Sequence, residues 1–204
     1  MNEKLFELPT LKLAKTLLGM ELVHQTDEGL ASGIIVETEA YMGPEDMAAH
    51  SFGGKRTPRT EIMYAEPGHV YVYFIYGMHT CFNIVSGPPH KPEAILIRAL
   101  EPKEGIPLMM HRRSMKIPVL ENGAWKPGQL KKLTNGPGKL CKAMGISLND
   151  YGLKLNAEHL YLKEYKTLSE EDIVSGPRIN VDYAGEAVHY PYRFWIKDNI
   201  YVSK

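Results

Sequence analysis

The sequence lacks the features that would place the protein in a membrane or on a secretory route. It has no apolar run approaching the roughly 18 residues that a membrane-spanning helix needs. Its first residues carry neither the basic patch nor the apolar stretch of a secretion signal. The two cysteines, Cys81 and Cys141, form no C-x-x-C pair, so neither a disulfide scaffold nor a zinc ribbon is indicated. We therefore expect a protein of the reducing cytoplasm with no membrane partner.

Several common catalytic signatures are also missing. The eight histidines form no H-x-H or H-E-x-x-H pattern and no cluster with the cysteines, which argues against a catalytic metal. The chain has no G-x-x-x-x-G-K-[ST] phosphate loop and no G-x-S-x-G nucleophile elbow. We expect a protein that uses neither a metal nor another cofactor.

What is present fits a globular protein with a substantial core. The chain has 204 residues, of which 44% are hydrophobic and 24% are charged. It contains no repeat, low-complexity tract or long linker, so we expect a single domain spanning residues 1–204.

Charge is balanced overall but unevenly distributed. The 24 basic residues equal the 24 acidic ones, which alone argues weakly against a nucleic-acid binder. Residues 1–50, however, hold three bases and nine acids, and residues 103–142 hold nine bases and two acids. A basic face could therefore meet a phosphate backbone although the sum cancels. The alternative is that both segments are ordinary solvated surface.

Apolar periodicity predicts mostly short strands and few helices. The expected helices are a capped one from Thr10 to Gly19, a short one around Leu108 to Arg113, and one from Lys139 to Met144. The expected strands are Ser32 to Thr38, a hairpin of His69 to Tyr76 and His79 to Val85, Ala94 to Leu100, and short ones after Ala157. We expect residues 103–136 to form a long surface excursion. The fold class is therefore α+β, a mostly antiparallel curved β-sheet flanked by helices with a protruding β-hairpin.

Two carboxylates and one arginine are the first candidates for chemistry. Glu37, Glu39 and Tyr41 follow an apolar strand and point to one side if the strand continues. Either this is a solvated strand end, or one glutamate serves as a general base. Arg98 interrupts a run of aliphatic residues and needs an acidic or phosphate partner, for which Glu37 or Glu39 is the candidate. The alternative is an edge-strand arginine that reaches outward to water.

Tyrosines concentrate in the predicted hairpin. The chain has twelve tyrosines against five phenylalanines and two tryptophans, and Tyr71, Tyr73 and Tyr76 lie on one hairpin strand. Tyrosine is common in strands because it packs well on a pleated surface. An aromatic side chain at the turn, where Tyr76 falls, is also suited to stack on a base or to fill the gap left by an extruded one.

Five segments together closely resemble the alkyladenine (3-methyladenine) DNA glycosylase family. They are VETEAYMGPEDMAAHS from Val36, TPR from Thr57, GHVYVYFIYGMHTCFNIVS from Gly68, LIRALEP from Leu96 and NGPGKLCKAMGI from Asn135. Their order and spacing are family-like, and the similarity covers nearly the whole chain. The resemblance implies an enzyme that flips alkylated purines, and often hypoxanthine, out of duplex DNA and cuts the N-glycosidic bond with water.

The resemblance also implies roles for individual residues. Glu39 matches the catalytic glutamate that activates the water, and Arg98 matches an arginine that helps to hold both. The residues that match the pocket for the flipped base are Tyr41, His50, Tyr73 and Asn83, of which His50 reads the purine edge and Asn83 discriminates against guanine. No lysine matches a Schiff-base nucleophile, which implies a monofunctional enzyme that leaves an abasic site.

Contacts with double-stranded DNA are implied at two places. Tyr76 matches the minor-groove wedge at the hairpin tip, and Met78 lies beside it. The candidates for contacts with the DNA backbone are Lys139, Lys142 and Arg59, joined by Lys55 and Arg56. The implied partner is duplex DNA containing damaged purines. We expect the protein to be a monomer that acts at the bacterial nucleoid in the cytoplasm.

Two other functions remain open at this point. A protein that binds damaged DNA without cutting it would keep Tyr76 and the basic surface but dispense with Glu39, so the presence of Glu39 with Arg98 counts against it. A hydrolase of nucleosides could use Glu37 and Glu39 as an acid–base pair, and it would need no aromatic tip and no basic excursion.

Overall fold

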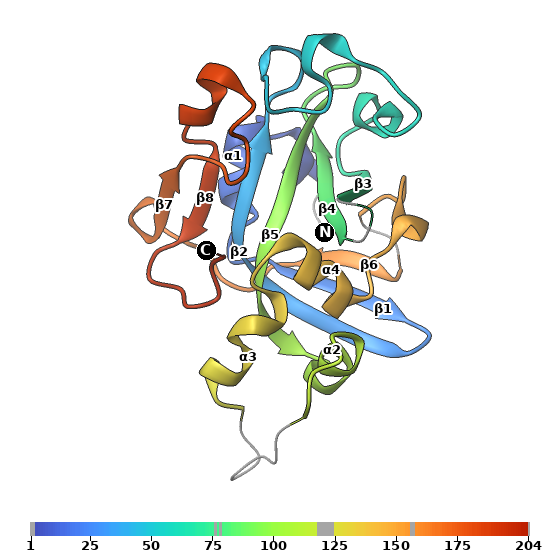
Figure 1. Ribbon diagram of the computed structural model, residues 1–204, viewed down its shortest axis with the longest axis vertical. Coiled ribbons are helices and arrows are strands. Elements are labelled where there is room, and N and C mark those ends of the chain that lie inside the picture. The colour runs from blue at the N-terminus through green and yellow to red at the C-terminus, as the bar shows by residue number, and fades with distance from the viewer. Residues whose placement is uncertain (1–2, 76, 78, 118–124, 156–157, 204) are drawn as a thin grey trace.

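An antiparallel sheet with helices on both of its faces forms the framework of the protein (Figure 1). The computed structural model describes residues 3–75, 77, 79–117, 125–155 and 158–203. The strands are β1 (Glu21–Thr26), β2 (Gly29–Tyr41), β3 (Val70–Ile75), β4 (His79–Ser86), β5 (Glu93–Glu104), β6 (Leu160–Lys163), β7 (Ile173–Gly176) and β8 (Arg193–Ile196). The α-helices are α1 (Thr10–Thr16), α2 (Ile106–Arg112), α3 (Pro127–Thr134) and α4 (Pro137–Met144). Short 3₁₀ turns are η1 (Glu3–Glu7), η2 (Gly43–Glu45), η3 (Phe52–Gly54), η4 (Glu61–Tyr64), η6 (Leu148–Asp150), η7 (Glu170–Asp172) and η8 (Gly185–His189).

The long strand β2 is the centre of the sheet. The strand order is β3-β4-β5-β2-β1-β6, with β8 paired to β2 and β7 paired to β8, and every pair is antiparallel. One edge of β2 pairs with β5, while its other edge pairs first with β1 and then with β8. The predicted α+β class with a mostly antiparallel sheet is therefore confirmed. The strands β2 and β5 are both longer than the sequence predicted.

Three irregularities interrupt the pairing of β2 with β5: one lies between Ser32 and Gly33, and the other two, around Val36 and Arg98, compensate each other. Ile35 pairs with Leu100 and Glu37 pairs with Ala99, so Val36 has no partner in the register. The next pair joins Thr38 to Ile97, which leaves Arg98 without a partner on the other strand. Bulges re-aim side chains and increase the local twist. The buried arginine that the sequence placed in a plain strand therefore stands at a bulge opposite the carboxylates.

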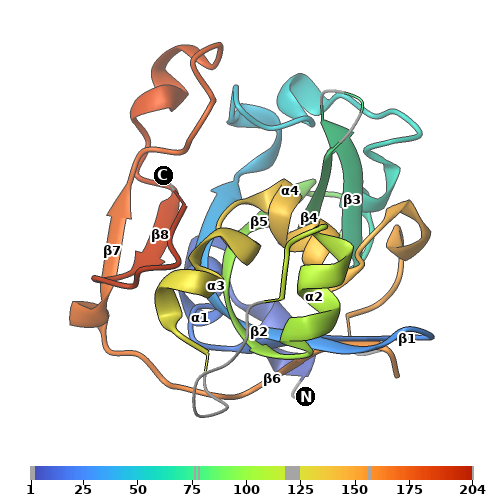
Figure 2. The same ribbon diagram turned by 60° about the horizontal axis from the view of Figure 1, so that its bottom comes forward.

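The sheet separates the apolar packing of α1 from the side that carries α3 and α4 (Figures 1 and 2). The hydroxyl of Thr38 donates to the carbonyl of Ala14 in α1 at 2.9 Å, so this side chain of β2 faces α1. Helix α4 contributes Leu140 and Cys141 to the main apolar cluster and packs against β4 and β5. Cys141 and Cys81 are both buried free thiols.

The helices differ from the prediction in two respects. Thr10 is the first residue of α1 rather than its cap; its hydroxyl is hydrogen-bonded to the carboxylate of Glu93 and, at 3.0 Å, to Ser86. The excursion holds α2, close to the expected position, but also α3, which begins at Pro127 and which the apolar periodicity did not predict. Proline is in fact favoured in the first turn of a helix, where its missing N–H costs nothing. Within the described ranges, no helix is long and apolar enough to cross a membrane.

The predicted hairpin is formed by β3 and β4. Their pairing runs from Val70 opposite Ile84 to Ile75 opposite His79. The two strands that the sequence predicted on either side of the turn are therefore confirmed. Tyr76 and Met78, the residues predicted for the tip, lie outside the described residues.

Candidate active site

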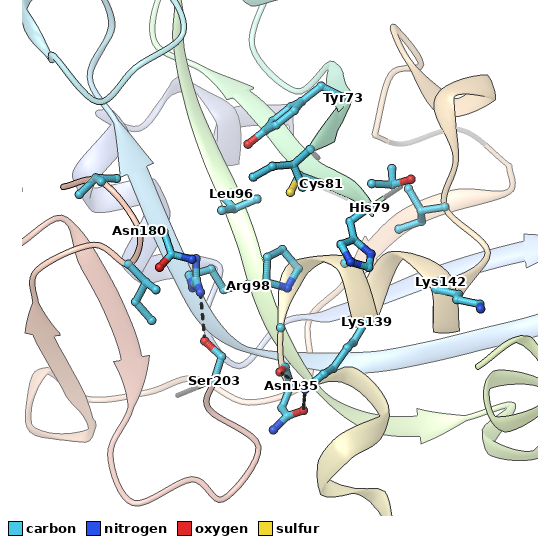
Figure 3. Close-up of a pocket in the computed structure, with 18 of the residues that line it drawn as sticks. Tyr73, His79, Cys81, Leu96, Arg98, Asn135, Lys139, Lys142, Asn180 and Ser203 are labelled. Carbon is cyan, nitrogen blue, oxygen red and sulfur yellow. Dashed lines mark hydrogen bonds between the residues drawn. The ribbon is translucent and has the colours of Figure 1, made fainter. Parts of the chain in front are cut away.

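A cavity of about 1020 Å³ opens where the hairpin, the centre of the sheet and the start of α4 meet (Figure 3). Its lining includes Tyr41 of β2, Tyr73 of β3, Arg98 of β5 and Lys139 of α4. The turn of Asn135 to Gly138 and the segment from Ile179 to Tyr183 complete its walls. Residues far apart in the sequence therefore share one polar and aromatic chamber.

Glu39 is fully buried, and three donors converge on its carboxylate. Tyr41 donates its hydroxyl to Oε2 at 2.9 Å, and Arg98 donates from Nη1 to the same oxygen at 3.3 Å. The backbone N–H of Ile179 donates to Oε1 at 2.7 Å. Burial and the charge of Glu39 raise the pKa of Tyr41 well above its usual value, so the phenol stays protonated and acts as the donor. These three donors fix the position of both carboxylate oxygens.

Arg98 bridges the two carboxylates that the sequence proposed as its partners. Its Nε donates to Glu37 Oε1 at 3.2 Å, and its Nη2 donates to the hydroxyl of Ser203 at 3.3 Å. Burial lowers the pKa of Arg98, but the charges of Glu39 and Glu37 outweigh burial and raise it overall. The predicted ion pair is confirmed, and the alternative of an arginine reaching outward to water is wrong.

Glu37 has a different environment from Glu39. Its Oε1 accepts from Arg193 Nε at 2.7 Å and from the Ser203 hydroxyl at 2.9 Å, besides Arg98. Its Oε2 accepts the backbone N–H of Ser203 at 2.7 Å. Like Glu39, Glu37 is fully buried and is not among the residues that line the cavity, so the two carboxylates differ in their partners and not in their exposure. This carboxylate therefore holds two arginines in place, which counts against an acid–base pair of Glu37 and Glu39.

The four side chains predicted to bind a base lie together, and one of them, Tyr41, is hydrogen-bonded to Glu39. The rings of His50 and Tyr73 meet edge to face with centroids 4.6 Å apart. Tyr41, His50, Tyr73 and Asn83 all line a small inner recess of about 40 Å³, together with Tyr183. The four predicted side chains therefore come from three different strands and a loop.

Hydrogen bonds and burial fix the state of His50. Its Nδ1 lies 2.8 Å from the hydroxyl of Tyr71, a residue whose pKa burial raises above its usual value. Burial, followed by the positive charges of Arg59 and Lys55, lowers the pKa of His50 to about 4. The imidazole is therefore neutral at physiological pH, and it faces the cavity as a polar but uncharged group.

The residues predicted to contact the DNA backbone differ in their surroundings. Lys139 and Lys142 line the cavity, and Lys139 Nζ donates to the side-chain oxygen of Asn135 at 3.0 Å. Arg59 is exposed, with its guanidinium 5.8 Å from the centre of the Tyr73 ring. Arg56, in contrast, forms an ion pair with Glu61 and stacks over Tyr64.

Sequence reasoning missed a second set of residues around the site. Ser203, Arg193, Ile179 and Tyr183 have no recognisable motif, and each reaches the site from the last 30 residues of the chain. Arg112, although it lies in the basic excursion, is occupied by Glu28. A phosphate therefore has fewer free cations to meet in this region than the charge count suggested.

Comparison with known proteins agrees with this geometry. The family model described as "Methylpurine-DNA glycosylase (MPG)" matches residues 4–200. A protein of Bacillus cytotoxicus is 52% identical over 203 residues, covering 98% of this chain and 97% of its own. Proteins of Bacillus cereus (51%) and Bacillus mycoides (50%) match over the same share of this chain and over 96% and 97% of their own, and all three are provisionally named 3-methyladenine DNA glycosylases. The chain thus belongs to the methylpurine-DNA glycosylase family and is a DNA glycosylase, an enzyme that hydrolyses N-glycosyl bonds.

Proposed function

We propose that this enzyme is a monofunctional glycosylase that flips alkylated purines out of duplex DNA and hydrolyses their N-glycosidic bond, which starts base-excision repair. The alkylated purines are 3-methyladenine and 7-methylpurines, and hypoxanthine and ethenoadenine are further candidate substrates. The observation that carries the proposal is the buried pair of Glu39 and Arg98 beside a recess walled by Tyr41 and Tyr73. A damage-binding protein without catalysis has no use for such a carboxylate.

Glu39 is the group proposed to accept a proton from the attacking water. The water oxygen forms a bond to C1′ of the sugar as the bond from C1′ to the purine nitrogen breaks, and the bonding electrons leave with the base. A purine alkylated at a ring nitrogen carries a positive charge and leaves as a neutral molecule. Arg98 pairs with Glu39 and orients its carboxylate. Because a carboxylate and not a lysine stands here, no covalent Schiff base forms and the DNA strand stays uncut.

The recess is proposed to select the base by ring stacking and by one polar edge. Tyrosine faces attract electron-poor rings, and a cationic alkylpurine is such a ring. The neutral His50 offers one hydrogen bond to the purine edge without repelling a positive charge. Asn83 is nearly buried and held by the carbonyl of Tyr71 at 3.0 Å, so it is a fixed obstacle to an exocyclic amino group.

Duplex DNA is proposed to lie across the mouth of the cavity. Lys139 and Lys142 line this cavity and Arg59 lies over the ring of Tyr73, so all three are suited to hold phosphates. From the sequence, Tyr76 and Met78 are the wedge that fills the gap left by the flipped nucleotide. We further propose that the enzyme works as a monomer, without cofactor, on the DNA of the bacterial cytoplasm.

A single assay tests this function. A labelled duplex with one hypoxanthine and a second duplex with alkylated purines are incubated with the protein in EDTA, and each is then split between alkali and no alkali. Cleavage only after alkali is the expected result. Binding without base release would favour a damage-binding protein, and release from free nucleosides instead of DNA would favour a nucleoside hydrolase.

A further inference from the structure

A second buried arginine, Arg178, lies behind the site and has no role in the mechanism proposed above. It belongs to the segment between β7 and η8, and its side chain is fully buried. Its Nη1 and Nη2 donate to the two carboxylate oxygens of Asp46 at 2.5 and 2.8 Å. A fork of this kind neutralises a charge whose burial would otherwise be costly. Arg178 does not line the cavity, so it does not touch a base that enters there.

The contacts of Arg178 nevertheless reach the strand that carries Glu39 and Tyr41, and Arg178 is next to the residue whose backbone binds Glu39. Its Nη1 also donates to the carbonyl of Ala40, the residue between Glu39 and Tyr41, at 3.0 Å. Its guanidinium carbon lies 4.9 Å from the centre of the Tyr41 ring. The next residue, Ile179, gives its N–H to Glu39. One side chain thus ties the backbone donor of the carboxylate to the strand that carries both Glu39 and Tyr41.

Its partner Asp46 extends the connection to the loop that carries His50. Besides accepting from Arg178, the carboxylate accepts the backbone N–H of Met42 at 2.9 Å and that of Ala48 at 3.0 Å. The hydroxyl of Tyr183, five residues beyond Arg178, lies 3.3 Å from the carbonyl of Ala48. The two loops that flank Tyr41 are therefore joined through this ion pair.

The number and direction of these bonds require a guanidinium. Arg178 reaches both oxygens of Asp46 and the carbonyls of Ala40 and Ala187, the last at 3.3 Å from Nη2. A lysine has three donors on one nitrogen and cannot span acceptors on separate elements in this way. Lysine at this position would keep the charge and the pairing with Asp46 but lose the bridge.

We propose that Arg178, paired with Asp46, is a positioning residue that aligns Glu39 with the base stacked on Tyr41. The proposal rests on the glycosylase function proposed above. It assigns to Arg178 an effect on the rate of base excision and no direct part in holding DNA. Misalignment of reacting groups by about 1 Å can cost roughly 100-fold in rate.

The test compares Arg178→Lys with a matched variant elsewhere. Arg112 is also a buried arginine, with Nε donating to Glu28 at 2.8 Å and Nη1 donating to the carbonyl of Ala143 at 3.3 Å, but it is distant from Tyr41 and Glu39. Both variants and the wild type are assayed by single-turnover excision from the alkylated duplex and by binding to a duplex with an abasic-site analogue. Thermal unfolding shows which variants are folded at the assay temperature.

We expect Arg178→Lys to excise about 10- to 100-fold more slowly while its affinity for the abasic duplex changes less than about twofold. Arg112→Lys should excise at the wild-type rate. Asp46→Asn is the second variant, and it should reproduce the loss of rate with unchanged binding. Wild-type excision by folded Arg178→Lys and Asp46→Asn would overturn the proposal, as would failure of both variants to fold, since Arg178 would then serve stability alone. If the wild type released no base, the glycosylase function itself would be wrong.

Discussion

Replacing Glu39 by glutamine is the most direct test of the chemistry, because it replaces one carboxylate oxygen by an NH₂ group and changes nothing else in the buried site. Glutamine can still accept the N–H of Ile179, but its amide group then faces the donors of Tyr41 and Arg98. Arg98 keeps its bond to Glu37, so no buried charge is left alone. We therefore expect a loss of about 1–3 kcal/mol in the free energy of unfolding.

The activation free energy of excision should rise by more than the free energy of unfolding falls. Removing a positioned general base costs about 10²- to 10⁴-fold, which corresponds to roughly 3–5 kcal/mol in the activation free energy. Single-turnover excision from a duplex with one alkylated purine measures this rate, and fluorescence anisotropy of the same duplex measures binding. Binding should be retained, because the lysines at the cavity mouth and the stacking tyrosines are unchanged.

Glu37→Gln is the matched control, since it alters the other buried carboxylate on the same arginine. Glu37 holds both Arg98 and Arg193, so its loss should destabilise the fold by about 3–5 kcal/mol. At a temperature where both variants are folded, Glu37→Gln should excise at least tenfold faster than Glu39→Gln. If Glu39→Gln excised at the wild-type rate, or if folded Glu37→Gln were the slower of the two, the assignment of the base would be wrong.

Three further predictions follow from the recess and the cavity mouth. Tyr71→Phe removes the hydroxyl on His50 and, by the value of one hydrogen bond of about 1 kcal/mol, should slow excision roughly fivefold in single-turnover assays without abolishing it. Because burial lowers the pKa of His50 to about 4 while the unfolded value is near 6.5, stability should fall as the pH drops from about 6.5 towards 4, and denaturant unfolding of His50→Asn should show a shallower pH dependence. Lys139→Ala and Lys142→Ala should each weaken binding to damaged and undamaged duplexes alike and reduce the slope of log affinity against log salt by about 0.9, measured by anisotropy; an unchanged slope would mean that these lysines do not touch phosphates.

The sequence predicted best what depends on neighbouring residues. The alternation in β3 and β4 defined a hairpin, because side chains on a half-buried strand must alternate. Arg98 was recognised as paired, because an arginine among aliphatic residues needs a charged partner wherever the chain supplies one. The same reasoning placed Glu37 and Glu39 on one side of a strand, as their shared contact with Arg98 shows.

Long-range pairings lay beyond that reasoning. Arg178 stands in an unremarkable loop, and its partner Asp46 is 132 positions away. Ser203 closes on Glu37 across 166 positions. Glu37 and Glu39 look equivalent in the sequence. Their partners distinguish them, since Ser203 and Arg193 bind Glu37 whereas the backbone of Ile179 binds Glu39. Such partners are decided by how the sheet curves and where its last strand returns, which no local pattern encodes.

The unpaired residues Val36 and Arg98 have a consequence for how the gene can change. At this place each strand carries one extra residue, so the two offsets cancel and the pairs beyond Thr38 keep the same register as those of Gly33 and Ile34. Deleting Val36 alone would leave the extra residue of β5, Arg98, without a compensating one, so the two parts of β2 would no longer share one register against β5. Substitutions can accumulate along these strands, but a loss or gain of one codon here should be tolerated only when the opposite strand changes by the same amount.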